Sequence, residues 1–282
     1  MSRTLTFAPL PSRALIAVGG PDWRSFLQGL ITQDVDTLQP GEARFGALLT
    51  PQGRLLYDLF VVGRPMSEGD GCWLDVLAEH RAAVLQRLTM YRLRAKVELA
   101  LDETPVSILY PGGGSAPAGA GWVADPRLPE LGWRGYGATA PEGAATADEA
   151  AREVQKLALG VPGPADWGSD KTYPIEANFD LLNGIDFKKG CFVGQETTSR
   201  MKRRGQIKSR MLPIAFDGPA PAPGAEILAG DLRAGVVTSA GEGRAIALLR
   251  LDRALGQSLT VDGRSVSVER PSWFELDGTS EA

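Results

Sequence analysis

The residues best suited to chemistry lie in one short window, residues 186–210, around Cys191. The window holds eight basic residues and two acids, so its net charge is +6, whereas the whole chain carries −4. A run of helix-forming residues begins at Gln195, so we expect Cys191 to lie just before a helix N-terminus. Nearby cations and helix N-termini both stabilise a thiolate. The sequence therefore predicts either a reactive or ligating thiol at Cys191 or, on the plainer interpretation, a buried inert cysteine.

The basic run Lys202 to Arg204 allows three interpretations. It could be a solvated helix end, an anion pocket for a polyglutamate tail, or a contact with RNA phosphates. The acidic remainder of the chain and the lack of interleaved aromatic residues argue against RNA. We therefore expect no direct nucleic-acid partner.

The other candidate ligands are few. Cys72 lies in an apolar run and is expected to be inert, and the single histidine, His80, is assigned no catalytic role. A zinc or cluster site contained in one chain needs about four Cys or His ligands, so this chain cannot build one alone. No run of about 18 apolar residues is present, so we expect no membrane span. Two cysteines and no recognisable signal peptide predict a cytoplasmic protein with reduced thiols.

Apolar periodicity predicts the elements that must position these residues. Strands are expected at 13–18, 43–49, 55–62, 72–77 and 96–101, with helices near 23–31, 79–91 and 148–159. This β-α-β-β…β-α-β order is typical of ferredoxin-like units. Residues 111–121 are rich in Gly, Pro, Ala and Ser, which favours a loop or linker.

The sequence pattern changes near residue 206. Five short strands, at 207–216, 235–239, 245–251, 258–261 and 265–268, are separated by Gly, Pro and Asp-Gly turns. That spacing is typical of a small antiparallel barrel. We therefore predict a region of ferredoxin-like units over residues 1–205 and a C-terminal β-barrel over 206–282.

The run Lys188 to Arg200, KKGCFVGQETTSR, resembles the signature K-G-C-[FY]-x-G-Q-E-x-x-x-R of the YgfZ family. This family comprises folate-binding proteins of iron–sulfur cluster maturation. Four further segments resemble the family: Phe26–Val35, Leu49–Arg54, Tyr91–Glu98 and Tyr173–Gly184. The last of these is similar above all to the mitochondrial-type branch of the family. The resemblance implies an α+β fold like that of the aminomethyltransferase T-protein, in which ferredoxin-like units and the barrel surround a tetrahydrofolate cavity.

The resemblance also implies site residues. Cys191 would be the functional thiol with Lys189 beside it, and Gln195, Glu196 and Arg200 complete the matched signature. Glu176 would be the carboxylate that contacts the pterin. Tyr57 and Asp58 occupy an acidic pair of the T-protein, but the first acid is replaced here by Tyr57, which puts aminomethyl transfer in doubt.

The function implied is assembly or repair of [4Fe–4S] clusters, with tetrahydrofolate as cofactor and iron–sulfur client or carrier proteins as partners. Some relatives are also linked to tRNA modification. Two alternatives remain open at this point: a folate-dependent aminomethyltransferase or one-carbon transferase, and an RNA-binding module.

Overall fold

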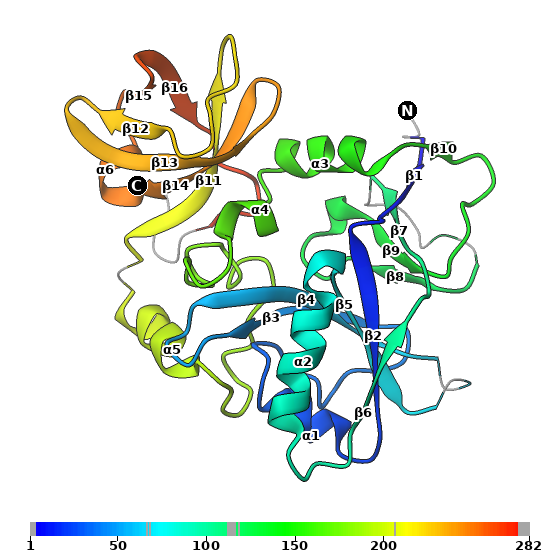
Figure 1. The fold of residues 1–282 in the computed structure, drawn as a ribbon. Helices are drawn as coiled ribbons and strands as arrows, with labels where there is room; N and C mark the ends of the chain where they lie inside the picture. The colour runs from blue at the N-terminus through cyan, green and yellow to red at the C-terminus, as the bar shows by residue number, and fades with distance from the viewer. Residues whose placement is uncertain are drawn as a thin grey trace.

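A computed structural model of the 282-residue chain describes residues 4–65, 67, 69–111, 117, 119–205 and 207–275. Its described residues form two five-stranded sheets and a closed six-stranded barrel (Figure 1). The predicted α+β fold class is confirmed by this architecture and by the structural comparison reported below.

The first sheet has the strand order β3-β4-β5-β2-β6, and all its neighbours are antiparallel. Its strands are β2 (Arg13–Gly19), β3 (Ala43–Leu49), β4 (Leu55–Gly63), β5 (Gly71–Leu77) and β6 (Glu98–Asp102). The helices α1 (Trp23–Gln28) and α2 (Arg81–Arg92), the latter preceded by the turn η2 (Ala78–His80), share an apolar core with the sheet. The predicted order of strands and helices in this region is confirmed, with small shifts at the ends.

The second sheet was not predicted. Its order is β10-β1-β7-β9-β8, and β1 pairs with β7 about a hundred residues later in the chain. Its strands are β1 (Thr6–Pro9), β7 (Val106–Tyr110), β8 (Trp122–Ala124), β9 (Trp133–Tyr136) and β10 (Ala145–Thr146). The predicted loop at 111–121 lies between β7 and β8, and its residues 112–116 and 118 are outside the described residues.

The barrel closes in the order β11-β14-β13-β12-β15-β16. Its strands are β11 (Ser209–Phe216), β12 (Glu226–Ala229), β13 (Leu232–Ala240), β14 (Arg244–Arg250), β15 (Leu259–Val261) and β16 (Arg264–Val268), with the short helix α6 (Leu251–Ala254). The prediction of a small antiparallel barrel is confirmed, but it missed β12, which is short and is preceded by a proline-rich segment. The division into domains at residues 205 and 206 stays a prediction.

Two of the described helices contact both the sheets and the barrel. α3 (Glu149–Ala158) contacts β1 and β14, and α4 (Pro164–Trp167) contacts β4 and β13, so both lie where sheets and barrel meet (Figure 1). α5 (Gln195–Arg204) follows a long irregular segment. The largest apolar core takes side chains from both sheets, from that segment and from the barrel, for example Phe45, Ile108, Phe179 and Ile246. Among the described helices, none is both long and apolar enough to cross a membrane.

Candidate functional site

Cys191 lies on the surface in the loop that leads into α5. Its side chain is exposed, and the helix begins four residues later at Gln195. The plainer expectation of a buried thiol at this position is therefore wrong, and the reactivity of Cys191 stays a prediction. Cys72, by contrast, is fully buried in β5, and burial raises the pKa of its thiol far above the usual range.

Two glycines fix the path of the cysteine loop. Gly194, the N-cap of α5, has φ +82°, a left-handed conformation that favours glycine. A Cβ atom on Gly194 would lie 2.5 Å from the carbonyl oxygen of Thr50 and 3.0 Å from Cα of Gly53. The cysteine loop therefore packs directly on the β3–β4 turn, which explains why both segments contain glycine.

Lys189 anchors the same loop to the N-terminal part of the chain. Its Nζ donates to the carbonyl oxygens of Gln28, Ile31 and Gln33, at 2.9, 2.7 and 2.9 Å. An ammonium group has three protons, so these bonds occupy all of its donors. Burial lowers the pKa of Lys189 to about 8. This geometry assigns Lys189 a positioning role, and the catalytic role predicted from the sequence finds no support in it.

Two of the remaining signature residues, Gln195 and Glu196, line a surface groove at the start of α5. The groove has a volume of about 680 Å³, and its walls include Phe187, Gln195, Glu196 and Lys202. The side-chain oxygen of Gln195 accepts a bond from the Phe192 backbone N–H at 3.3 Å, which closes the loop before the helix. Glu196 and Arg200 are exposed on α5. These three residues were predicted to bind a cofactor, and none of them lines the central cavity.

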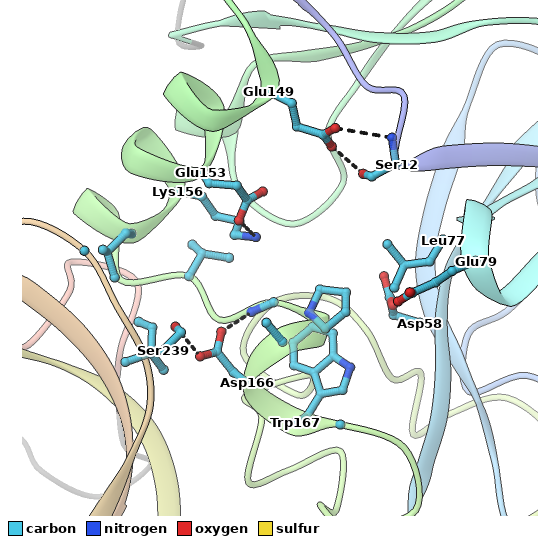
Figure 2. Close-up of a pocket in the computed structure, with 18 of the residues that line it drawn as sticks. Ser12, Asp58, Leu77, Glu79, Glu149, Glu153, Lys156, Asp166, Trp167 and Ser239 are labelled. Carbon is cyan, nitrogen blue, oxygen red and sulfur yellow. Dashed lines mark hydrogen bonds and ion pairs between the residues drawn. The ribbon is translucent and has the colours of Figure 1, made fainter. Parts of the chain in front are cut away.

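The central cavity lies where the first sheet, α3, α4 and the barrel meet. Its volume is about 740 Å³, and residues from all four parts line it (Figure 2). Leu56, Leu77 and Leu157 supply apolar wall, and the ring of Trp167 forms one side. Asp166 fixes the barrel side because its carboxylate accepts from Thr238 Oγ1 at 2.7 Å and from Ser239 Oγ at 2.5 Å.

Asp58 and Tyr57 point to opposite faces of β4. Asp58 is buried, lines the cavity and pairs with Arg13, with 3.2 Å between Oδ2 and the guanidinium. Tyr57 packs instead with the α1–α2 core, and its ring centroid lies 5.2 Å from that of His80. Because neighbouring residues of a strand alternate in direction, only one of this pair can reach the cavity. The prediction of Tyr57 as a cofactor contact is therefore not supported.

Glu176 does not line the central cavity. Its carboxylate accepts from the backbone N–H of Tyr173 at 3.0 Å, and its own carbonyl accepts from Met211 at 2.8 Å. Burial raises the pKa of Glu176, an effect that this hydrogen bond and the nearby Arg54 only partly oppose. Glu176 thus closes a turn beside the barrel, and the structure does not bring it together with Asp58.

Sequence reasoning missed a buried ionic network behind the cavity. Asp75 accepts from Arg13 at 2.6 Å, from Arg134 at 2.5 Å and from the Tyr136 hydroxyl at 2.9 Å. Asp125 pairs with Arg127 at 2.7 Å. The available sequence signal was a charged residue inside an apolar strand, as in Cys72–Leu77, because such a charge needs a partner when it is buried.

The network keeps its carboxylates ionised. Burial alone would raise the pKa of Asp125, but Arg127, its hydrogen bonds and Arg134 lower that pKa to about 2. Burial opposes ionisation of Asp75 as well, and Arg13 and Arg134 lower its pKa below the usual range. The charges buried behind the cavity are therefore largely neutralised by pairing.

Comparison with known proteins supports this organisation. Residues 208–276 match the family model of the CAF17 C-terminal beta-barrel domain. The crystal structure of the glycine cleavage system aminomethyltransferase T from Bartonella henselae superposes with a TM-score of 0.77 over 97% of this chain and 87% of that one. Its sequence identity is 18%, so this likeness shows the fold alone.

Curated relatives extend the comparison to most of the chain. The iron-sulfur cluster assembly factor IBA57 homolog of Neurospora crassa is 32% identical over 75% of this chain and 54% of its own length. The Mycosarcoma maydis homolog is 31% identical over 76% and 58%. Against these fungal relatives, the chain spans a little over half of their length. Human IBA57 is 32% identical over 78% of this chain and 70% of its own.

These relatives correct one expectation. They are named as mitochondrial proteins, so the predicted cytoplasmic location is contradicted. The identity to human IBA57 and the share of that protein covered establish the family: this chain belongs to the IBA57 family of iron–sulfur cluster assembly factors.

Proposed function

We propose that the protein acts in the assembly of iron–sulfur clusters and that Cys191 supplies one ligand to a cluster in transit. The observation that carries this proposal is the exposed thiol on a loop held by Lys189 and Gly194. The sequence left open whether the thiol binds a cluster or attacks a folate-borne one-carbon unit. Cys191 is not among the residues that line the central cavity, which favours the ligand role.

One thiol cannot hold a cluster alone, because such clusters take about four protein ligands. Across the described ranges, no group of three or more His, Cys, Asp or Glu residues is arranged to hold a metal ion. The other ligands would come from a client protein, a carrier protein or a small thiol. Exposed cations near the loop, such as Lys188 and Arg200, would attract the anionic thiolate-ligated cluster.

Complementation tests this proposal. In cells that lack the protein, the Cys191→Ser variant should fail to restore [4Fe–4S] enzyme activity, and Cys72→Ser should restore it. Both variants must accumulate to the wild-type level for the comparison to count. Full restoration by Cys191→Ser would exclude the thiol mechanism.

The central cavity also fits tetrahydrofolate in size and lining. Ligand cavities commonly measure about 300–1,000 Å³, and this one, at about 740 Å³, combines an apolar wall with the ring of Trp167. One oxygen of Asp58 is bonded to Arg13, so the other remains to accept from the N–H edge of a pterin. When bound, folate would supply a carrier for one-carbon units. Asp58 is the proposed anchor, and the anchoring role expected of Glu176 has no support in its position.

Calorimetric titration with tetrahydrofolate tests the cavity. Loss of a charge-assisted hydrogen bond is worth about 1.5–3 kcal/mol, so Asp58→Asn should weaken binding by about 10- to 150-fold. Glu176→Gln, outside the cavity, should bind as the wild type does. Equal weakening by both variants, or no binding by a folded wild-type protein, would exclude this folate site.

Three finer points belong to the same proposal. The signature around Cys191 supports kinship with the folate-binding YgfZ proteins and a share in cluster repair. Tyr57 gives no support to aminomethyl transfer, because its ring lies on the face of β4 opposite to Asp58. The cations of α5 suit an anionic protein surface, and we do not propose RNA as a partner.

A further inference from the structure

A small side chamber opens beside the central cavity. It has a volume of about 70 Å³ and shares Ser12, Asp58 and Glu149 with the cavity lining. Its inner wall is formed by side chains of the buried ionic network, and α3 supplies its outer wall. At roughly 10–15 Å³ for each water-sized occupant, the chamber has room for about five non-hydrogen atoms.

Arg152 is the exception among the guanidinium groups of the chamber wall. Arg13, Arg127 and Arg134 each form an ion pair with a buried aspartate. Arg152 is only 3% exposed, yet among the described residues no carboxylate lies within 4 Å of it. Its contacts are a hydrogen bond to Gln155 Oε1 and the Tyr110 ring, 5.7 Å from the guanidinium carbon.

Glu149 is the corresponding acid without a cation. It lies one turn before Arg152 on α3, and its carboxylate accepts from the backbone N–H and the hydroxyl of Ser12 (Figure 2). No described cation lies within 4 Å of it. Residues three apart on a helix commonly pair when their charges are opposite. Here both side chains face the chamber and do not meet.

The other charged groups at the chamber are already neutralised. Asp58 pairs with Arg13, and Glu153 pairs with Lys156 at the cavity side of α3 (Figure 2). A buried cation without an anionic partner is costly, and burial accordingly lowers the pKa of Arg152 to about 10. An anionic group that entered the chamber would satisfy the guanidinium, and a cationic group on the same molecule would satisfy Glu149.

We propose that this chamber binds a small α-amino acid as its zwitterion. The carboxylate pairs with Arg152, and the ammonium group faces Glu149 at the mouth. Glycine has about five non-hydrogen atoms, so it matches the volume, and alanine is close to the upper limit. This inference does not depend on folate binding, because the chamber and its charges are separate from the proposed pterin anchor.

Titration of the folate-free protein with four probes tests the zwitterion. Glycine should bind with a dissociation constant at or below about 1 mM. Acetate lacks the ammonium and methylamine lacks the carboxylate, so each should bind at least about tenfold more weakly. Leucine is too large and should not compete. Equal binding of glycine and acetate would overturn the zwitterion, and no binding of glycine at about 50 mM would overturn the site.

Substitutions at Arg152 and Glu149 test whether these residues bind the carboxylate and the ammonium group, respectively. Arg152→Met keeps the length of the side chain and should abolish glycine binding, whereas Arg152→Lys should retain part of it. Glu149→Gln should weaken glycine by about tenfold and leave acetate unchanged, which a merely structural role would not do. Glu142→Gln, at an exposed acid before α3, is the control. If Arg152→Met fails to fold, the contrast between glycine and acetate in Glu149→Gln still decides, and identical losses for both probes would overturn the assignment.

Discussion

The two cysteines mark two regions built on opposite principles. Cys72 lies in β5, the strand that carries Asp75, and the charged groups around that aspartate are buried and paired. Cys191 lies in a loop whose neighbours Lys188, Glu196 and Arg200 are exposed. Buried paired charges fix one arrangement of the two sheets, whereas exposed cations leave a surface available to a partner. The molecule thus separates the residues that hold its shape from those that meet other molecules.

The largest expected effect is a loss of stability on substitution of a charged residue in the buried region. Asp75→Asn removes the charge that Arg13 and Arg134 share, and it should lower the free energy of unfolding by about 3–5 kcal/mol. Urea denaturation measures this loss. Asp252→Asn, at the exposed pair with Arg250, should leave the urea midpoint unchanged. Similar losses in both variants would contradict the contrast between the two regions.

The alkylation rates of the two thiols give a second test of the contrast between the two regions. In the native protein, iodoacetamide should alkylate Cys191 faster than Cys72 by a factor on the order of 10³ or more, because Cys72 reacts only after the sheet opens. Intact-mass analysis should show one modified thiol before denaturation and two after it. Early modification of Cys72 in the native protein would show that β5 opens far more readily than its burial implies.

Acid should affect the buried region first. The pKa of Asp125 is about 2 in the folded protein and about 3.8 when unfolded, so its ionised form stabilises the fold above pH 4. That contribution, about 2 kcal/mol, is lost as pH falls from 4 through 2. Asp125→Asn should therefore flatten the decline of stability over this range. Asp231→Asn, at an exposed turn, should keep the wild-type profile, which acid denaturation followed by circular dichroism would reveal.

The smallest effect concerns the cysteine loop. Gly194→Ala places a Cβ against the β3–β4 turn in a left-handed conformation, and it should cost about 1–2 kcal/mol in thermal unfolding experiments. Gly190→Ala in the same loop meets no atom within 4 Å and should change stability by less than about 0.5 kcal/mol. Equal tolerance of both changes would mean that the loop does not need its contact with the turn.

The sequence predicted those strands and helices that are determined by residues close together in the chain. Apolar runs located the strands of the first sheet and most of the barrel, and the glycine and charge around Cys191 located the head of α5. The second sheet was missed because its strands are short and pair with partners far away in the sequence, as β1 does with β7.

The cavity was beyond such reasoning for a related reason. Ser12, Asp58, Asp166 and Ser239 come from distant parts of the chain, and only tertiary packing places them together. The family resemblance singled out the signature around Cys191, and its role as the functional thiol stays a prediction. It could not show that Glu176 closes a turn or that Lys189 uses its protons on backbone carbonyls.

The anchor at Lys189 has a consequence for how the protein is made. Its three hydrogen bonds join residue 189 to residues 28–33, about 160 positions earlier in the chain. A nascent chain cannot close this link until residue 189 has left the ribosome, and contacts of such long sequence separation form slowly. Cys191 therefore reaches its fixed position only after the N-terminal region has folded, so a truncated or misfolded chain does not present the thiol in this setting.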